Sequence, residues 1–279
     1  MSRALVLGGG GVTGVAWEIG VLAGLAEAGV DLTGADLVVG TSAGSVVAAQ
    51  VANGVPLADM YGRQLAGRGA EVAARMSAGA LLRWLAAMVT TRDPVRARTR
   101  IGRLALAART MPEAERRAVI EARLPVHEWP PRRRLLVTAV DAETGQFRAF
   151  DRDSGVRLVD AVGASCAVPG VWPPVTIGGR RWIDGGARSV ANVDLAAGCE
   201  HVVVLAPLTA GFGPLPSVAT QVKALRGASV AVVSPDAAAR RAIGRNALDS
   251  ARRAPSARAG RAQAGAAAAA VAAAWSSAA

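Results

Sequence analysis

One pentapeptide constrains the fold of this chain more than any other feature. Gly40-Thr41-Ser42-Ala43-Gly44 directly follows an apolar run at 37–39 and precedes small and apolar residues at 45–49. The run predicts a buried strand, and the residues after the turn predict a helix. A serine at the tip of such a strand–turn–helix has the setting of a nucleophile elbow, whose strained turn presents Oγ. Ser42 is therefore the candidate nucleophile, although the pentapeptide alone is also compatible with an ordinary glycine-rich turn.

A second glycine-rich loop follows the first predicted strand, at 4–7. Four consecutive glycines and then Val12-Thr13-Gly14 precede a segment with apolar residues at helical spacing. Consecutive glycines before a helix expose backbone N–H groups that bind an anion. Residues 9–14 fit the G-x-G-x-x-G dinucleotide pattern, so a nucleotide pyrophosphate is one candidate. The other candidate is an oxyanion that forms on an acyl carbonyl beside Ser42.

The second predicted strand favours the oxyanion. A dinucleotide site needs an acidic residue about 20 residues after the glycines, at the end of that strand, to bind the ribose. Here that strand ends in the Ser42 pentapeptide, and Asp31 and Asp36 both precede it. The first strand would then supply the anion site and the second the nucleophile.

A third motif supplies a candidate base. Asp184-Gly185-Gly186 ends a short predicted strand that follows a hairpin-like stretch at 177–182. A nucleophilic serine needs a base, and adjacent glycines let a carboxylate approach closely. Because an unperturbed aspartate has a pKa of about 3.9, this role requires a desolvated site. The alternative is an Asp-Gly turn that closes a surface hairpin.

Together the three motifs resemble the patatin-like phospholipase family of lipid acyl hydrolases, over roughly residues 4 to 210, including the stretch 164–175. The resemblance implies that Ser42 is the nucleophile and Asp184 its only partner. It also implies that the backbone N–H groups of Gly10 and Gly11 form the oxyanion hole, with no cofactor and no metal. The motif glycines are Gly9, Gly14, Gly40, Gly44, Gly185 and Gly186.

Two features bear on this assignment. Many family members carry arginine or lysine where this chain has Thr13, so phospholipid, lysolipid and acylglycerol substrates all stay open. The chain has only two histidines, His127 and His201, and both lie at predicted element boundaries. A serine–histidine–aspartate triad would require one of them to reach Ser42, and we favour the dyad.

Predicted strands at 4–7, 37–39, 135–140, 146–150 and 202–206 alternate with helical stretches. This alternation predicts an α/β/α three-layer fold with a mainly parallel central sheet. A hairpin turn at 141–145 makes the sheet mixed. We expect one domain over 1–279, with a helical cap-like insertion at 55–131 and C-terminal helices at 218–279. Within the insertion, Leu81, Trp84 and Met88 are candidate acyl-chain contacts, and core packing explains them equally well.

The net charge of +11 does not indicate nucleic-acid binding, because the arginines are scattered and aromatic residues make up only 4%. Arg96, Arg100 and Arg103 share one face of a predicted helix, with Ile101 on another. That face either contacts an anionic membrane or is simply solvated.

The chain has two cysteines, Cys166 and Cys199, and no apolar run of 18 residues, so we expect a cytoplasmic protein, with peripheral membrane contact as a further option. Hydrolysis and acyl transfer use the same acyl-enzyme. A non-catalytic module that binds lipid or nucleotide through the glycine loop is the alternative function.

Overall fold

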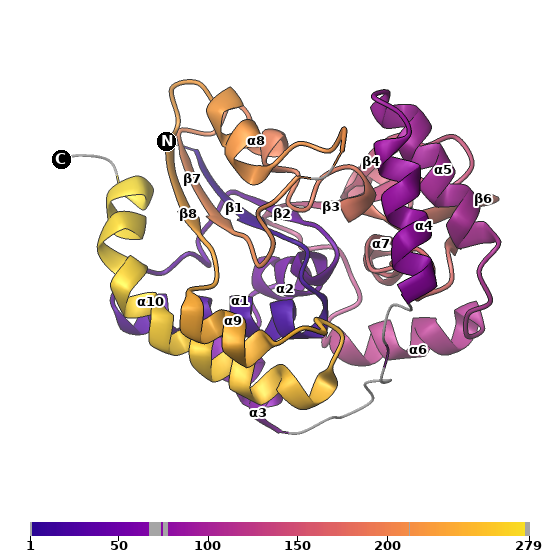
Figure 1. Cartoon of the computed structure of the whole chain (residues 1–279). Coiled ribbons are helices and arrows are strands. Elements are labelled where there is room, and N and C mark those ends of the chain that lie inside the picture. Colours follow the sequence, from indigo (N-terminus) through magenta and orange to yellow (C-terminus); the bar gives the residue numbers. More distant parts are fainter. Residues whose placement is uncertain (1, 67–73, 75–77, 212, 277–279) are drawn as a thin grey trace.

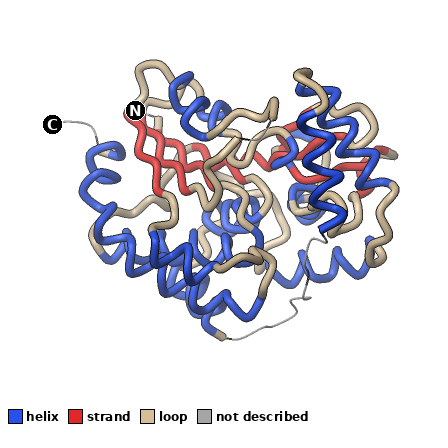
Figure 2. Tube along the Cα trace, viewed as in Figure 1, coloured by secondary structure: helices blue, strands red, loops and turns tan. Residues whose placement is uncertain are grey.

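Five strands of the computed structural model pair in parallel and form the centre of one sheet. The structure describes residues 2–66, 74, 78–211 and 213–276 of the chain. The parallel strands lie in the order β3, β2, β1, β7 and β8. Their bounds are β1 (Arg3–Leu7), β2 (Leu37–Gly40), β3 (Arg134–Asp141), β7 (His201–Leu205) and β8 (Ser229–Val233). The expected α/β fold with a mostly parallel sheet is confirmed (Figure 2).

Three antiparallel strands extend the sheet beyond β3 and make it mixed, as the sequence predicts. They are β4 (Phe147–Phe150), β5 (Val175–Ile177) and β6 (Arg180–Asp184). Ala139 of β3 pairs with both β4 and β6, so these strands lie on opposite sides of β3. Val137 pairs with both β2 and β4, which places β2 on the same side as β6. The ends of β2 and β6 therefore meet along one side of β3.

Side chains alternate between the two faces of the central strands, as expected for buried strands. Leu5 and Leu7 of β1 belong to the larger core, beneath α1 and its neighbours, whereas Ala4 and Val6 belong to the core on the other face. Figure 1 shows α8 on one face of the sheet and α1, α2, α9 and α10 on the other. The helices around the sheet are α1 (Gly11–Glu27), α2 (Ala43–Ala52), α3 (Leu57–Leu65), α7 (Leu158–Ser165), α8 (Val218–Ala224), α9 (Ala237–Ile243) and α10 (Arg253–Trp275).

Helix α10 packs along α1 at very short range. A Cβ atom on Gly20 would lie 2.1 Å from the Ala257 carbonyl oxygen, and one on Gly260 would lie 2.3 Å from the Trp17 carbonyl oxygen. The Trp275 indole N–H, at the end of α10, donates to the Asp31 carbonyl over 3.1 Å. Glycines thus let the last described helix close over the first one.

The region at 55–131 contains α3, α4 (Ala78–Val89), α5 (Pro94–Leu106) and α6 (Glu113–Arg123). Trp84 packs against a small core with Ile101 and Ile183, which favours core packing over acyl-chain contact. The side chains of Leu81 and Met88 lie outside the described part of the chain. The division into one domain with an insertion stays a prediction.

The C-terminal region, expected to consist of helices at 218–279, is not helical throughout. It contains the strand β8, and its second helical stretch is broken after Ile243, with α10 continuing to Trp275. Gly244 ends α9 with φ 74° and ψ −164°, a conformation that glycine adopts more readily than other residues. None of the helices in the described ranges is long and apolar enough to span a bilayer.

Candidate active site

Ser42 occupies the strained turn that the sequence predicts. It follows β2, precedes α2, and has φ 53° and ψ −120°, which is rare for a residue with a side chain. The neighbouring glycines have no room for a side chain. A Cβ atom on Gly40 would lie 2.5 Å from Ser45 Cα, and one on Gly44 would lie 2.1 Å from the Leu7 carbonyl oxygen. Close approach of strand, turn and helix therefore requires glycine at both positions.

Three side chains hold the Ser42 backbone in this conformation. Its N–H donates to Ser165 Oγ over 2.9 Å, and its carbonyl accepts from Ser45 Oγ at 2.6 Å and from Cys166 Sγ at 3.3 Å. Sequence reasoning missed the roles of Ser165 and Cys166. Their only sequence signal is that they fall within 164–175, the stretch that looks like the family but contains no catalytic motif.

The carboxylate of Asp184 lies at the end of β6, where β6 meets the end of β2. Gly186 N–H donates to Asp184 Oδ1 over 2.7 Å, and Asp184 N–H donates to the Ala167 carbonyl. Asp184 is only 5% exposed. Burial raises its pKa to about 7, although the Ser42 side chain and the Gly186 N–H act to lower it. Ser42 and Asp184 are thus brought together, in the desolvated setting that a basic aspartate requires.

Glycine is also required after Asp184. A Cβ atom on Gly185 would lie 2.2 Å from Thr138 Oγ1 of β3. The Asp-Gly-Gly sequence therefore turns against the central sheet, and the alternative of a surface hairpin turn is wrong because Gly185 is buried.

The glycine loop lies beside Ser42. A Cβ atom on Gly9 would lie 3.5 Å from Ser42 Cβ, and the Gly9 N–H is fixed to the Val190 carbonyl over 2.7 Å. By contrast, the N–H groups of Gly10 and Gly11 donate to no acceptor within the described residues. Gly11 has φ 61°. Two backbone donors at a helix N-terminus therefore stay available for an anion.

Thr13 is fully buried, on the side of the loop that faces the C-terminal region. Its N–H and its Oγ1 both donate to the Ala247 carbonyl, over 3.1 Å and 3.2 Å. The segment between α9 and α10 thus covers this position, where many family members have a cation. Thr13 binds the protein's own backbone here.

Neither histidine lies near Ser42. His201 begins β7 beside Arg3, at the opposite end of β1 from the glycine loop, and its Nδ1 lies 2.8 Å from the Ala274 carbonyl oxygen. His127 is exposed and contacts the Glu121 carbonyl. The next residue, Glu128, accepts from Asn53 at the far end of α2. The structure therefore contradicts a serine–histidine–aspartate triad.

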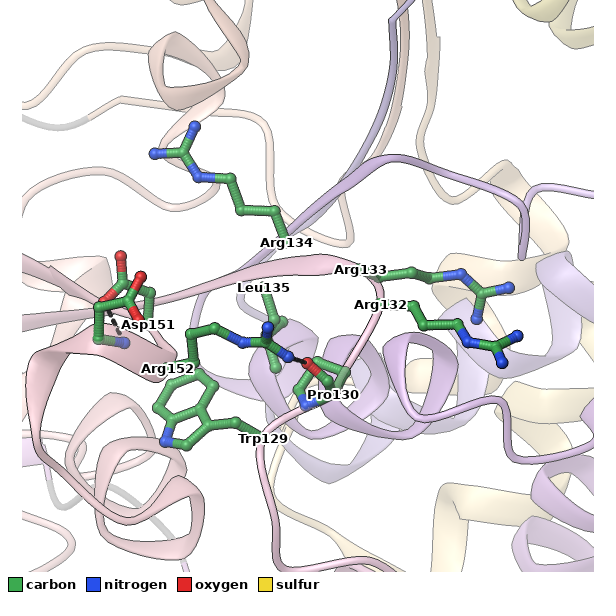
Figure 3. A pocket seen from close by; sticks show the side chains of 9 residues that line it. Trp129, Pro130, Arg132, Arg133, Arg134, Leu135, Asp151 and Arg152 are labelled. Carbon is green, nitrogen blue, oxygen red and sulfur yellow. Dashed lines mark hydrogen bonds between the residues drawn. The ribbon is translucent and has the colours of Figure 1, made fainter.

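A second region of interest is an arginine-rich pocket of about 230 Å³ at the start of β3 (Figure 3). Arg132 and Arg133 point the same way, and Arg152 donates to the Pro130 carbonyl. This pocket lies at the opposite end of β3 from Ala139, the partner of Asp184. Among the described residues, no cluster of three or more histidine, cysteine, aspartate or glutamate side chains could hold a metal ion.

The sequence profile of patatin-like phospholipases matches residues 5–197. The chain belongs to the patatin-like phospholipase family. All three motifs and the stretch 164–175 fall within the matched range, so the resemblance expected from the sequence is confirmed.

Individual relatives of this patatin-like protein are more distant or partial. The lysophospholipase nte1 of Aspergillus oryzae is 45% identical over 69 residues, which is 24% of this chain and 4% of that protein. VipD from Legionella pneumophila is 15% identical with a TM-score of 0.42, over 73% of this chain and 50% of VipD. The type III effector ExoU is 17% identical with a TM-score of 0.37, over 94% and 53%. With TM-scores below 0.5, the last two likenesses carry no weight for function.

Proposed function

We propose that this patatin-like protein is a serine acyl hydrolase that cleaves carboxylic ester bonds of lipids. The observation that carries the proposal is the pairing of Ser42, in a strained elbow, with a buried Asp184 whose pKa is about 7. A general base is most effective when its pKa lies near the working pH. Asp184 meets this condition without a histidine.

The proposed reaction has two steps. As Ser42 Oγ attacks the ester carbonyl, Asp184 accepts its proton. The oxyanion of the tetrahedral intermediate accepts hydrogen bonds from the N–H groups of Gly10 and Gly11, each contributing roughly 2.7–4 kcal/mol to catalysis. Asp184 then protonates the leaving alcohol. In the second step Asp184 accepts a proton from the water that attacks the acyl-enzyme, and it returns this proton to Ser42 Oγ as the fatty acid is released.

The substrate class comes from the family, and the head group stays open among phospholipid, lysolipid and acylglycerol. The partly matching relative is named a lysophospholipase. Thr13 is buried against Ala247, so this position offers no cation to a lipid phosphate. This supports substrates whose recognition does not depend on a phosphate beside the oxyanion loop.

We further propose that α4 and α5 contact an anionic membrane. Leu82, Val89 and Leu106 are large apolar side chains exposed on these helices. On α5, Arg96, Arg100 and Arg103 are exposed, whereas Ile101 is buried against the edge of the sheet that carries Ile183, next to Asp184. Exposed apolar side chains among arginines fit a surface of anionic headgroups.

A fluorophosphonate probe tests the proposal, because it labels only an activated serine. Wild type should be labelled and should hydrolyse a p-nitrophenyl ester, and both signals should vanish in Ser42→Ala. A folded wild type that is neither labelled nor active would refute catalysis and favour a module that binds lipid or nucleotide without turnover.

A further inference from the structure

Asn192 has an unusual conformation and lies beside both halves of the site. Its φ is 51° and its ψ is 44°, and Ser42 is the other non-glycine residue with a positive φ among those described. It is fully buried. Residues in such conformations persist only where their surroundings hold them, and they cluster at functional sites.

The Asn192 side chain contacts the elbow and the aspartate loop at the same time. Its Nδ2 donates to Thr41 Oγ1 over 3.0 Å, and it lies 3.4 Å from the Gly185 carbonyl oxygen. Thr41 immediately precedes Ser42, and Gly185 immediately follows Asp184. The same nitrogen lies 3.0 Å from the Ser189 carbonyl oxygen and 3.4 Å from Thr138 Oγ1.

Further contacts fix which end of the amide faces Thr41. Asn192 Oδ1 accepts from Arg188 Nη1 over 2.7 Å. Arg188 in turn forms an ion pair with Asp194 over 2.5 Å, and its guanidinium lies over the Phe147 ring. Because arginine only donates, the amide oxygen must point to Arg188 and the nitrogen to the site.

We propose that Asn192 is a positioning residue that sets the placement of Ser42 relative to Asp184. The inference rests on the proposed dyad and adds to it. The Ser165 and Cys166 contacts hold the Ser42 peptide unit, whereas the Asn192 amide bridges the two loops that carry the reacting groups. Displacement of reacting groups by about 1 Å costs about 10²-fold in rate, so a loose bridge should lower turnover more than binding.

Two variants separate positioning from folding. Asn192→Gly removes the side chain and tolerates the left-handed backbone. Asn192→Asp keeps the size and an acceptor for Arg188 but removes the donor to Thr41. Asn53→Asp is the matched control, because Asn53 also donates to backbone carbonyls, at the far end of α2. Each variant is assayed for p-nitrophenyl ester kcat and KM and for the rate of fluorophosphonate labelling per folded molecule.

The expected result is a fall of about 10²-fold in kcat and in the labelling rate for both Asn192 variants, with KM within about twofold and Asn53→Asp unchanged. Thr41→Val should reproduce the loss, Thr41→Ser should restore activity, and Thr41→Val should add little to Asn192→Asp. If Asn192→Gly does not fold, Asn192→Asp and the Thr41 pair carry the test.

Wild-type labelling rates in folded Asn192→Asp and Thr41→Val, or additive losses in the double variant, would overturn the positioning role. A wild type that is folded but unreactive would instead overturn the proposed dyad. The two failures are therefore distinguishable.

Discussion

The backbone N–H of Ser42 donates to the Ser165 hydroxyl over 2.9 Å, so a residue at the end of α7 holds the backbone of the candidate nucleophile in place. Both groups are buried. Asp184, at the end of β6 in the antiparallel part of the sheet, lies beside the same turn. The elbow thus depends on residues about 120 positions further along the chain, whose contribution can be measured.

Ser165→Ala should destabilise the protein by about 1–3 kcal/mol, because it leaves the buried Ser42 N–H without an acceptor. It should also slow fluorophosphonate labelling, since the strained turn can relax. Urea unfolding monitored by circular dichroism measures the first effect. Ser229→Ala, at an exposed position at the start of β8, is the control and should change the stability by less than about 0.5 kcal/mol. Equal stability of the two variants would contradict the role given to Ser165.

Asp184→Asn should lower kcat by about 10⁴-fold while the protein stays folded, because the amide cannot accept the Ser42 proton. Ester turnover at pH 8 and the labelling rate measure this loss. Asp153→Asn, at an exposed position in a short 3-10 helix, makes the same chemical change away from the site and should leave both rates unaltered. Retention of more than a tenth of the wild-type activity in Asp184→Asn would rule out Asp184 as the base.

The pH dependence should report the raised pKa of Asp184. Activity requires the ionised carboxylate, so kcat/KM should rise with pH and level off above about 7. Because the folded-state pKa lies above the unfolded value, the folded protein binds more protons between these values, and stability contributed by this group falls as pH rises from about 4 to about 7. Asp184→Asn should therefore gain stability relative to wild type at pH 8 and show no gain at pH 4. If kcat/KM instead reached half of its plateau value below pH 5, the raised pKa of Asp184 would be contradicted.

Glu18 gives a second, independent pH effect. It is fully buried on α1, both carboxylate oxygens have no hydrogen-bond partner among the described residues, and burial raises its pKa well above the usual value despite the nearby Gly8 N–H. The same linkage predicts that wild-type stability falls as pH rises above the unfolded pKa of about 4.3. Glu18→Gln should flatten this dependence without a loss of activity. Urea unfolding at pH 5 and pH 8 measures it, with exposed Glu143→Gln as control.

The proposed membrane surface predicts salt-dependent binding to anionic vesicles. Replacing Arg96, Arg100 and Arg103 by glutamine should weaken binding by about 10²-fold, given about 1 kcal/mol per arginine near such a surface. The matched control replaces Arg132, Arg133 and Arg152, which line the pocket at the other end of β3. Cosedimentation with phosphatidylserine-containing and neutral vesicles distinguishes them. If both triple variants lost vesicle binding equally, the binding would depend only on the overall charge, and the proposed membrane surface on α4 and α5 would be contradicted.

Local patterns predicted the parts of the site that each depend on one short segment. The strand–turn–helix at Ser42 and the glycine loop are encoded by neighbouring residues, because glycine permits turns and close approaches that other residues cannot make, whereas β-branched residues favour strands. The contacts of Ser165 and Asn192 with the elbow join distant segments, and no local pattern encodes them. The strand β8 was missed because a short apolar run has no periodicity that separates a strand from a buried helix.

The contact between Thr13 and Ala247 joins the first turn of α1, directly after the glycine loop, to a segment that is synthesised much later. Residue 247 is synthesised more than two hundred residues after residue 13. Helix α10, which closes over α1 through Gly20 and Gly260, comes later still. A chain truncated between residues 247 and 253 would keep the Thr13–Ala247 contact but lack α10, so we expect its glycine loop to be held less firmly than in a chain that contains this helix.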